Sequence, residues 1–156
     1  VLYLKQEVGM PLDQAALGYA AFSAAMALSR FSGDYLRQRF SEKRLLLVGG
    51  TTAAVAMTVV LLSGNAWIAL GGFVLVGAGL APVAPVLFSA ATRVPGVSRA
   101  AAIASVTSIG YAGFMIGPPL IGGLAHATSL TVALSVIVVS ASLLAFGSRF
   151  VPGRHG

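Results

Sequence analysis

The chain has 156 residues, of which 57% are hydrophobic and 9% charged, and its formal net charge is +6. Soluble domains carry roughly 25% charged residues, so the composition excludes an ordinary water-soluble domain and indicates a membrane protein. The chain contains no cysteine, which excludes disulfides, thiolate nucleophiles and thiolate metal sites.

Residues 1–14 begin the chain with a short apolar stretch followed by a polar one. Residues 1–4 are apolar, and residues 5–13 are polar and contain the helix breakers Gly9 and Pro11. No charged segment followed by an apolar core, as in a signal peptide, is present. We expect residues 1–14 to be the outer end of a truncated preceding helix plus an external loop, so the chain is a fragment of something larger.

Five apolar runs follow, each near the roughly 20 residues that a spanning helix needs. We expect helices at about residues 15–33, 45–63, 66–91, 100–125 and 130–147, which together form one transmembrane bundle over residues 15–148. The connections at 64–65 and 126–129 are short, so consecutive helices are expected to be antiparallel neighbours. Residues 149–156 are expected to form a cytoplasmic tail.

The basic residues give this bundle an orientation. Nine of the ten fall at alternate junctions between the apolar runs, and only Lys5 falls on the other side. Because Lys and Arg are retained in cytoplasmic loops, we expect a multi-pass protein of the cell (inner or plasma) membrane with its C-terminus in the cytoplasm. The nine are Arg30, Arg37, Arg39, Lys43, Arg44, Arg93, Arg99, Arg149 and Arg154.

Neither nucleic acid nor a metal is an expected partner. The basic residues lie in short loops without interleaved aromatic residues, which argues against a nucleic-acid surface. The two histidines, His126 and His155, are too few and too far apart for a metal site. No cofactor is implied, and no paired carboxylates or Cys-His pair at membrane depth indicate an enzyme.

The first inner loop, residues 29–44, reads SRFSGDYLRQRFSEKR. It resembles the cytoplasmic gating loop of the major facilitator superfamily, whose pattern is a Gly and an Asp followed by an Arg, an aromatic residue, a Gly and a basic pair. Gln38 and Ser41 depart from that pattern, where the family has an acidic residue and a Gly. The resemblance implies a gating loop, and the alternative is a basic loop that only sets topology. The gating residues would be Arg30, Gly33, Asp34, Arg37, Arg39, Lys43 and Arg44.

The helix that leads into this loop has one polar face. At 100° per residue, Tyr19, Ser23, Met26 and Arg30 lie within about 60° of one another, and Asp34 continues the same side. Arg30 and Asp34 are four residues apart, so an ion pair is possible if the helix extends that far. Arg30 could equally be an interfacial anchor.

Two later helices carry prolines and glycines. Pro82 and Pro85 should weaken the third helix in mid-membrane, which is tolerated only where the helix is buried in protein or lines a cavity. Its glycines, Gly71, Gly72, Gly77 and Gly79, are expected to serve packing.

The fourth helix has a strip of Gly110, Gly113 and Gly117, where a neighbouring backbone can approach closely. Thr107, Ser108 and Tyr111 lie on the roughly opposite arc, which can face an aqueous path. Pro118 and Pro119 should kink the outer third of this helix.

The resemblance covers nearly the whole chain and implies the C-terminal half of a facilitator transporter, approximately helices eight to twelve of twelve. The implied fold is an all-α partial six-helix half-bundle with five transmembrane helices, built from three-helix repeats. The implied activity is transport of a small solute by alternating access, with the missing N-terminal half as partner. An uncharged lining suits a neutral polar solute such as a sugar, or an amphipathic drug: Tyr19, Ser23, Thr107, Ser108 and Tyr111.

A second hypothesis is a structural membrane fragment or small helical subunit without transport activity. It predicts that the polar faces point at partners and that no water path exists.

Overall fold

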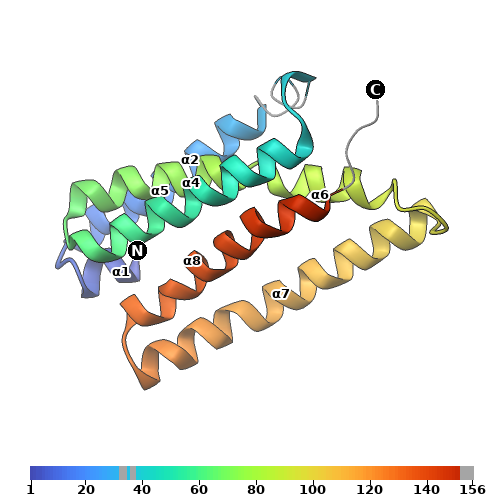
Figure 1. The fold of residues 1–156 in the computed structure, drawn as a ribbon. Helices are drawn as coiled ribbons and strands as arrows, with labels where there is room; N and C mark the ends of the chain where they lie inside the picture. The colour runs from blue at the N-terminus through green and yellow to red at the C-terminus, as the bar shows by residue number, and fades with distance from the viewer. Residues whose placement is uncertain (32–34, 36–37, 152–156) are drawn as a thin grey trace.

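The computed structural model describes residues 1–31, 35 and 38–151, and its regular elements are helices packed side by side (Figure 1). In chain order they are α1 Leu2–Gln6, α2 Leu12–Phe31, α4 Glu42–Ser63, α5 Ala66–Leu80, α6 Val83–Ala91, α7 Arg99–Ala127, α8 Leu130–Gly147 and the 3-10 turn η1 Ser148–Phe150.

Four helical segments of the described chain are long and apolar enough to cross a membrane: Glu42–Ser63, Ala66–Ala91, Arg99–Ala127 and Leu130–Phe150. The predicted all-α membrane fold is confirmed. Helix α2 differs from these four, because its 20 residues include Asp13, Gln14 and Arg30 and are therefore more polar. At 1.5 Å per residue α2 is about 30 Å long, which suffices for a crossing, and that crossing stays a prediction.

Side-chain caps begin four of the helices. The Ser41 hydroxyl accepts a hydrogen bond from the backbone N–H of Arg44 at 3.3 Å, and Asn65 accepts one from Trp67 at 2.9 Å. Ser98 and Ser129 cap α7 and α8 in the same way. Such caps satisfy N–H groups that have no partner inside the helix. The Ser41 cap explains why α4 begins at Glu42, three residues before the predicted start.

The third predicted span is interrupted where its prolines suggested. Helix α5 ends at Leu80, Pro82 is the N-cap of α6, and Pro85 lies in the first turn of α6. A proline at the start of a helix loses no hydrogen bond, because the first N–H groups are unpaired in any case. The predicted weakening of this span is confirmed.

The helices pack in the order α2, α5, α4, α8 and α7 (Figure 1). Helices α4 and α5, and α7 and α8, are sequence neighbours in contact, as predicted. The prediction is wrong for α2 and α4: the main partner of α2 in the described chain is α5. The ten residues between α2 and α4 free α4 from lying directly beside α2, whereas the two-residue link 64–65 forces α5 against α4.

Glycines determine how closely the central helices approach. A β-carbon on Gly79 of α5 would lie 2.7 Å from the carbonyl oxygen of Gly49 on α4, and one on Gly50 would lie 2.8 Å from the carbonyl oxygen of Ala141 on α8. Gly72 and Gly77 are equally enclosed, which confirms their packing role, whereas Gly71 faces open space. Helix α4 therefore holds α5 and α8 at two adjacent glycines.

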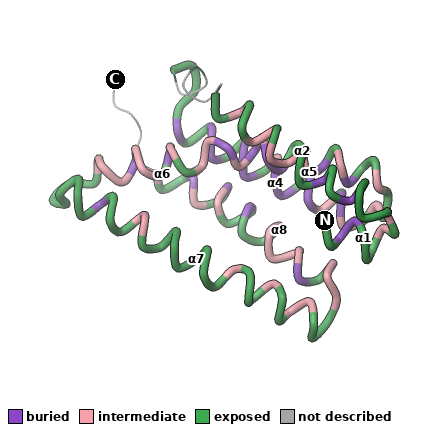
Figure 2. The backbone as a smooth tube through the Cα atoms, turned by 180° about the vertical axis from the view of Figure 1, so that it is seen from behind, coloured by how far each residue is buried: buried purple, intermediate pink, exposed green. Residues whose placement is uncertain are grey.

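The buried residues are concentrated on α4 and α5, and α7 is almost entirely exposed (Figure 2). The largest apolar cluster joins Ala53, Ala56 and Met57 of α4 to Val76 of α5 and Ala141 of α8. Along all of α7 only Ala102 is buried. Helix α7 thus presents most of its surface for contacts outside the described chain.

Candidate functional site

A half-buried ion pair lies at the end of the bundle where α4 and α7 begin and α6 and α8 end, which we call the basic end. It joins Glu42, the first residue of α4, to Arg93, which follows the end of α6. Both guanidinium Nη atoms donate to the carboxylate, Nη1 to Oε1 at 3.3 Å and Nη2 to Oε2. Such two-point contacts fix orientation as well as adding energy.

Ser89 of α6 completes the pair. Its hydroxyl donates to Glu42 Oε1 at 2.9 Å and accepts from Arg93 Nη1 at 2.8 Å. Ser89 lies one helical turn before Arg93, so both side chains project from the same side of the α6 end. We call Glu42, Ser89 and Arg93 the clasp.

An apolar cluster lies one helical turn from the clasp on α4 and α6. Leu45 and Leu46 of α4 pack with Val86 of α6, and Leu144 of α8 and Val151, which follows η1, pack against them. The Glu42 side chain is only 4% exposed, whereas that of Arg93 is 30% exposed. Since Arg93 retains access to water, the pair can open without leaving both charges buried.

The arrangement holds the ends of α4 and α6 together. In the described part of the chain, no three His, Cys, Asp or Glu side chains gather as a metal site would require. A buried carboxylate bound by one arginine and one serine is a structural contact that can be made or broken. The clasp therefore links α4 to α6 in a way that a movement of either helix would disrupt.

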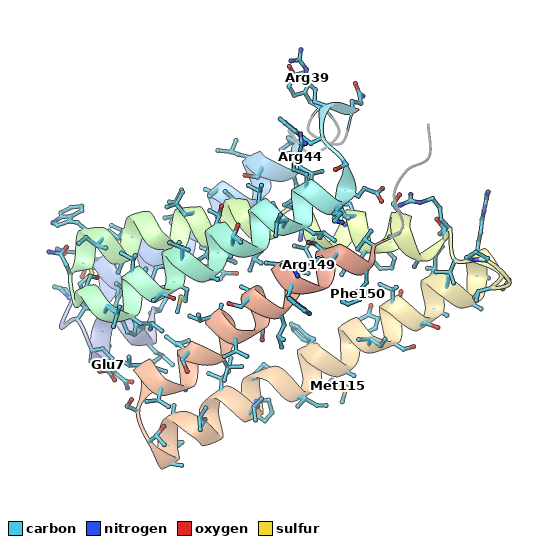
Figure 3. All side chains as sticks on the ribbon, in the orientation of Figure 1. Glu7, Arg39, Arg44, Met115, Arg149 and Phe150 are labelled. Carbon is cyan, nitrogen blue, oxygen red and sulfur yellow. The ribbon has the colours of Figure 1, made fainter. Side chains whose placement is uncertain are left out.

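The predicted gating residues surround the same end. Arg30 lies in the last turn of α2, and Lys43 and Arg44 lie exposed in the first turn of α4. The guanidinium of Arg39 lies over the ring of Tyr35, 5.2 Å from its centroid. Figure 3 shows Arg39 and Arg44 at this end and Glu7 at the other. Gly33, Asp34 and Arg37, and with them the predicted Arg30–Asp34 pair, lie outside the described residues.

The predicted substrate-path residues are divided between two helices. Tyr19 and Tyr111 are each 67% exposed, on α2 and α7 respectively. Ser23 and Thr107 are half-buried and Ser108 is exposed. Helices α2 and α7 are not packing partners and lie at opposite ends of the helix order given above. The described chain does not bring the two groups together, and their role stays a prediction.

The glycine strip Gly110, Gly113 and Gly117 meets no neighbour in the described chain. A β-carbon at any of the three would have no atom within 4 Å. Gly113 and Gly117 instead line a cavity of about 920 Å³ between α7 and α1. Helix α7 continues through Pro118 and Pro119 as one element of 29 residues. The packing surface expected here therefore has no partner among the described helices.

Sequence reasoning missed the clasp. From the sequence, Glu42 has no predicted role, and Arg93 is predicted only to set topology. They are 51 residues apart, so no local pattern connects them. Two weak signals were present: Ser89 and Arg93 are four apart on one helix face, and Glu42 follows a capping serine.

Comparison with known proteins assigns the family. The Major Facilitator Superfamily model matches residues 1–155. An uncharacterized MFS-type transporter of Yersinia pestis is 36% identical over 92% of this chain and 37% of its own length. The membrane protein MosC of Rhizobium meliloti is 34% identical over 99% of this chain and 38% of its own length.

An uncharacterized transporter of Sinorhizobium fredii is 35% identical over 92% of this chain and again 38% of its own length. The chain thus spans little more than a third of each of these relatives. With nearly every residue matched by the family model, this chain belongs to the Major Facilitator Superfamily.

Proposed function

We propose that this chain is the C-terminal half of a permease that moves a small solute across the membrane by alternating access. The observation that carries the proposal is the clasp, because it joins α4 to the end of α6 at the end where the predicted gating loop lies. In the helix order that the family resemblance implies, these two helices belong to successive three-helix repeats. Alternating access needs contacts that form in one state and break in the other.

The clasp has the properties of such a contact. Glu42 and Arg93 are bound through two hydrogen bonds, yet Arg93 is 30% exposed and can turn to water when the helices separate. An ion pair buried on all sides would hold the bundle in one state, because opening it would leave charges without solvent. The clasp and the basic loop together form the proposed gate on the cytoplasmic side.

The rest of the transporter is proposed by the same reasoning. Nine of the ten basic residues fall at alternate junctions between the apolar runs, which supports a cytoplasmic basic end and an inner-membrane location. The exposed faces of α2 and α7 are the proposed surfaces toward the missing N-terminal half and the substrate path. Their uncharged polar side chains suit a neutral polar solute or an amphipathic drug.

The test needs no knowledge of the substrate. In a cysteine-free version of the full-length protein, Ser108→Cys reports whether the path is open to an impermeant thiol reagent added outside. If the clasp closes the cytoplasmic side, Glu42→Gln and Arg93→Gln should lower the outward-open population and slow this labelling. A loss of about 1.4 kcal/mol corresponds to a tenfold change in the equilibrium constant between the two states.

Glu7→Gln is the matched control, since it removes an exposed carboxylate at the opposite end. It should leave the labelling rate of Ser108→Cys unchanged. If neither clasp variant alters that rate in correctly folded protein, the clasp does not take part in gating. Complete protection of Ser108→Cys in every variant would favour a non-transporting membrane subunit.

A further inference from the structure

A groove on the outside of α4 and α5 has features of a phospholipid site. It has a volume of about 540 Å³ and is lined chiefly by Thr51, Val55 and Val59 of α4 and by Ile68, Gly71 and Leu75 of α5. Gly71 contributes width, because a β-carbon there would meet no atom within 4 Å. We call this the α4–α5 groove.

The groove faces away from the protein. At 100° per residue, Gly49 and Gly50 lie about 140° and 240° around α4 from Arg44, and these glycines contact α5 and α8. Val48, Val55 and Val59 all lie within about 60° of Arg44 on the remaining side. These three valines are 48–64% exposed, so no other described helix covers this side of α4.

Arg44 lies on the same face of α4 as the groove, beyond the end that Thr51 lines. It is seven residues before Thr51 on the same face of α4, which places the two about 10 Å apart along the helix axis. Val55 is about 16 Å from Arg44 by the same measure, close to half of the roughly 30 Å hydrocarbon thickness. An acyl chain from a headgroup at Arg44 would therefore enter the groove at Thr51 and end just beyond Val55. Gly71 lies at that end, because its neighbour Gly72 packs against Ala56 and Val60.

The charges at this end favour an anionic headgroup. The chain has four carboxylates. Glu7, which follows α1, and Asp13 of α2 lie at the opposite end, and Glu42 binds Arg93. The fourth, Asp34, lies outside the described residues. Among the described residues Arg44 makes no ion pair. A phospholipid whose headgroup carries a net negative charge would supply an ionic partner for Arg44, which the described chain does not provide.

We propose that the α4–α5 groove binds a phospholipid with an anionic headgroup, with Arg44 at the phosphate and one acyl chain between α4 and α5. The proposal concerns binding and does not depend on transport. A diffuse attraction of basic residues to the membrane would not depend on any one position. Binding at this site requires both Arg44 and the open space at Gly71.

The experiment uses the full-length protein, purified with its lipids exchanged for defined mixtures, and native mass spectrometry to count retained lipid. Phosphatidylglycerol should be retained in preference to phosphatidylcholine. Arg44→Gln should weaken its retention roughly fivefold, as expected for one basic residue at a membrane surface. Arg44→Lys keeps the charge and should retain most of the binding.

Gly71→Leu tests the groove, because the leucine extends into the space proposed for the acyl chain and its β-carbon meets no atom within 4 Å. It should abolish preferential retention, whereas Gly71→Ala should not. Arg149→Gln removes another exposed charge of the basic end, which lies in η1 directly after α8, and should leave retention unchanged. Thermal unfolding of each variant verifies folding.

Three results would overturn the proposal: equal retention of phosphatidylglycerol and phosphatidylcholine, equal losses for Arg149→Gln and Arg44→Gln, or full retention in folded Gly71→Leu. If Arg44→Gln does not fold, the comparison of lipid retention between Gly71→Leu and Gly71→Ala is sufficient to test the proposal. A second copy of the protein retained in place of lipid, and lost in Gly71→Leu, would assign the groove to an oligomer interface and equally refute the lipid site.

Discussion

Gly49 of α4 and Gly79 of α5 face each other so closely that a β-carbon on Gly79 would lie 2.7 Å from the carbonyl oxygen of Gly49. The two helices cross at this point with no side chain between them. Small residues permit such contacts in membranes, where packing rather than hydrophobic burial drives helix association. The position of α5 relative to α4, and therefore of α6 and the clasp, depends on these two glycines.

Gly79→Ala is expected to destabilise the full-length protein by about 1–3 kcal/mol, the usual cost of forcing extra atoms into a packed site. Thermal unfolding in detergent measures the change. Gly71→Ala is the control on the same helix, because its β-carbon enters open space. Since alanine favours a helix over glycine by up to about 1 kcal/mol, that control should be neutral or slightly stabilising. Equal destabilisation by both would contradict the close crossing.

The clasp predicts a coupling between two distant positions. Glu42→Gln or Arg93→Gln alone should cost about 1–3 kcal/mol, because each leaves the other charged group without its partner. The double variant should cost clearly less than the sum of the two, because no charge is then left unpaired. A double-mutant cycle on thermal or denaturant unfolding measures the coupling energy, and strictly additive effects would show that the pair contributes no interaction.

The apolar pattern was sufficient for the helices, because each span had to satisfy its own backbone within the lipid. The predicted bounds of the third span, 66–91, and of the fifth, 130–147, agree with those of the helical segment Ala66–Ala91 and of α8. Errors of about three residues arose at α2 and α4. At α4 the cause is a polar first turn after the Ser41 cap, which an apolar window does not include.

The order in which the helices pack and the contacts of the clasp could not be predicted from the sequence, for a different reason. A contact such as Glu42 with Arg93 depends on which helices pack together, and the loop between α2 and α4 is long enough to allow several orders. The glycines show the same limit. Gly71 and Gly72 are adjacent in the sequence, yet Gly72 is enclosed by Val60 whereas Gly71 faces open space.

The membrane orientation predicts which loops a reagent can reach. A cysteine at Val97, beside the start of α7, should be protected from an impermeant thiol reagent in intact cells, whereas Ala127→Cys at the other end of α7 should react. Both positions are exposed and neither side chain caps a helix. Ser41, Ser98 and Asn65 are poorer choices, since replacing a cap costs typically about 1 kcal/mol. Labelling of Val97→Cys from outside would reverse the proposed topology.

The fourth prediction concerns the glycine strip of α7. In the described chain Gly113 and Gly117 have open space around them, so Gly113→Leu has nothing here to collide with. If the strip receives a helix from the rest of the transporter, as the sequence predicts, the leucine should destabilise the full-length protein by about 1–3 kcal/mol. Thermal unfolding of the full-length protein measures this.

Ser108→Ala on the opposite arc of α7 is the matched control. It removes one hydroxyl from an exposed position and changes the volume little, so it should leave the unfolding temperature nearly unchanged while altering access to, or affinity in, the substrate path. Together the two variants determine which face of α7 is packed. If Gly113→Leu is tolerated and Ser108→Ala destabilises, the helix is turned the other way in the complete transporter, and Thr107, Ser108 and Tyr111 face protein instead of the solute.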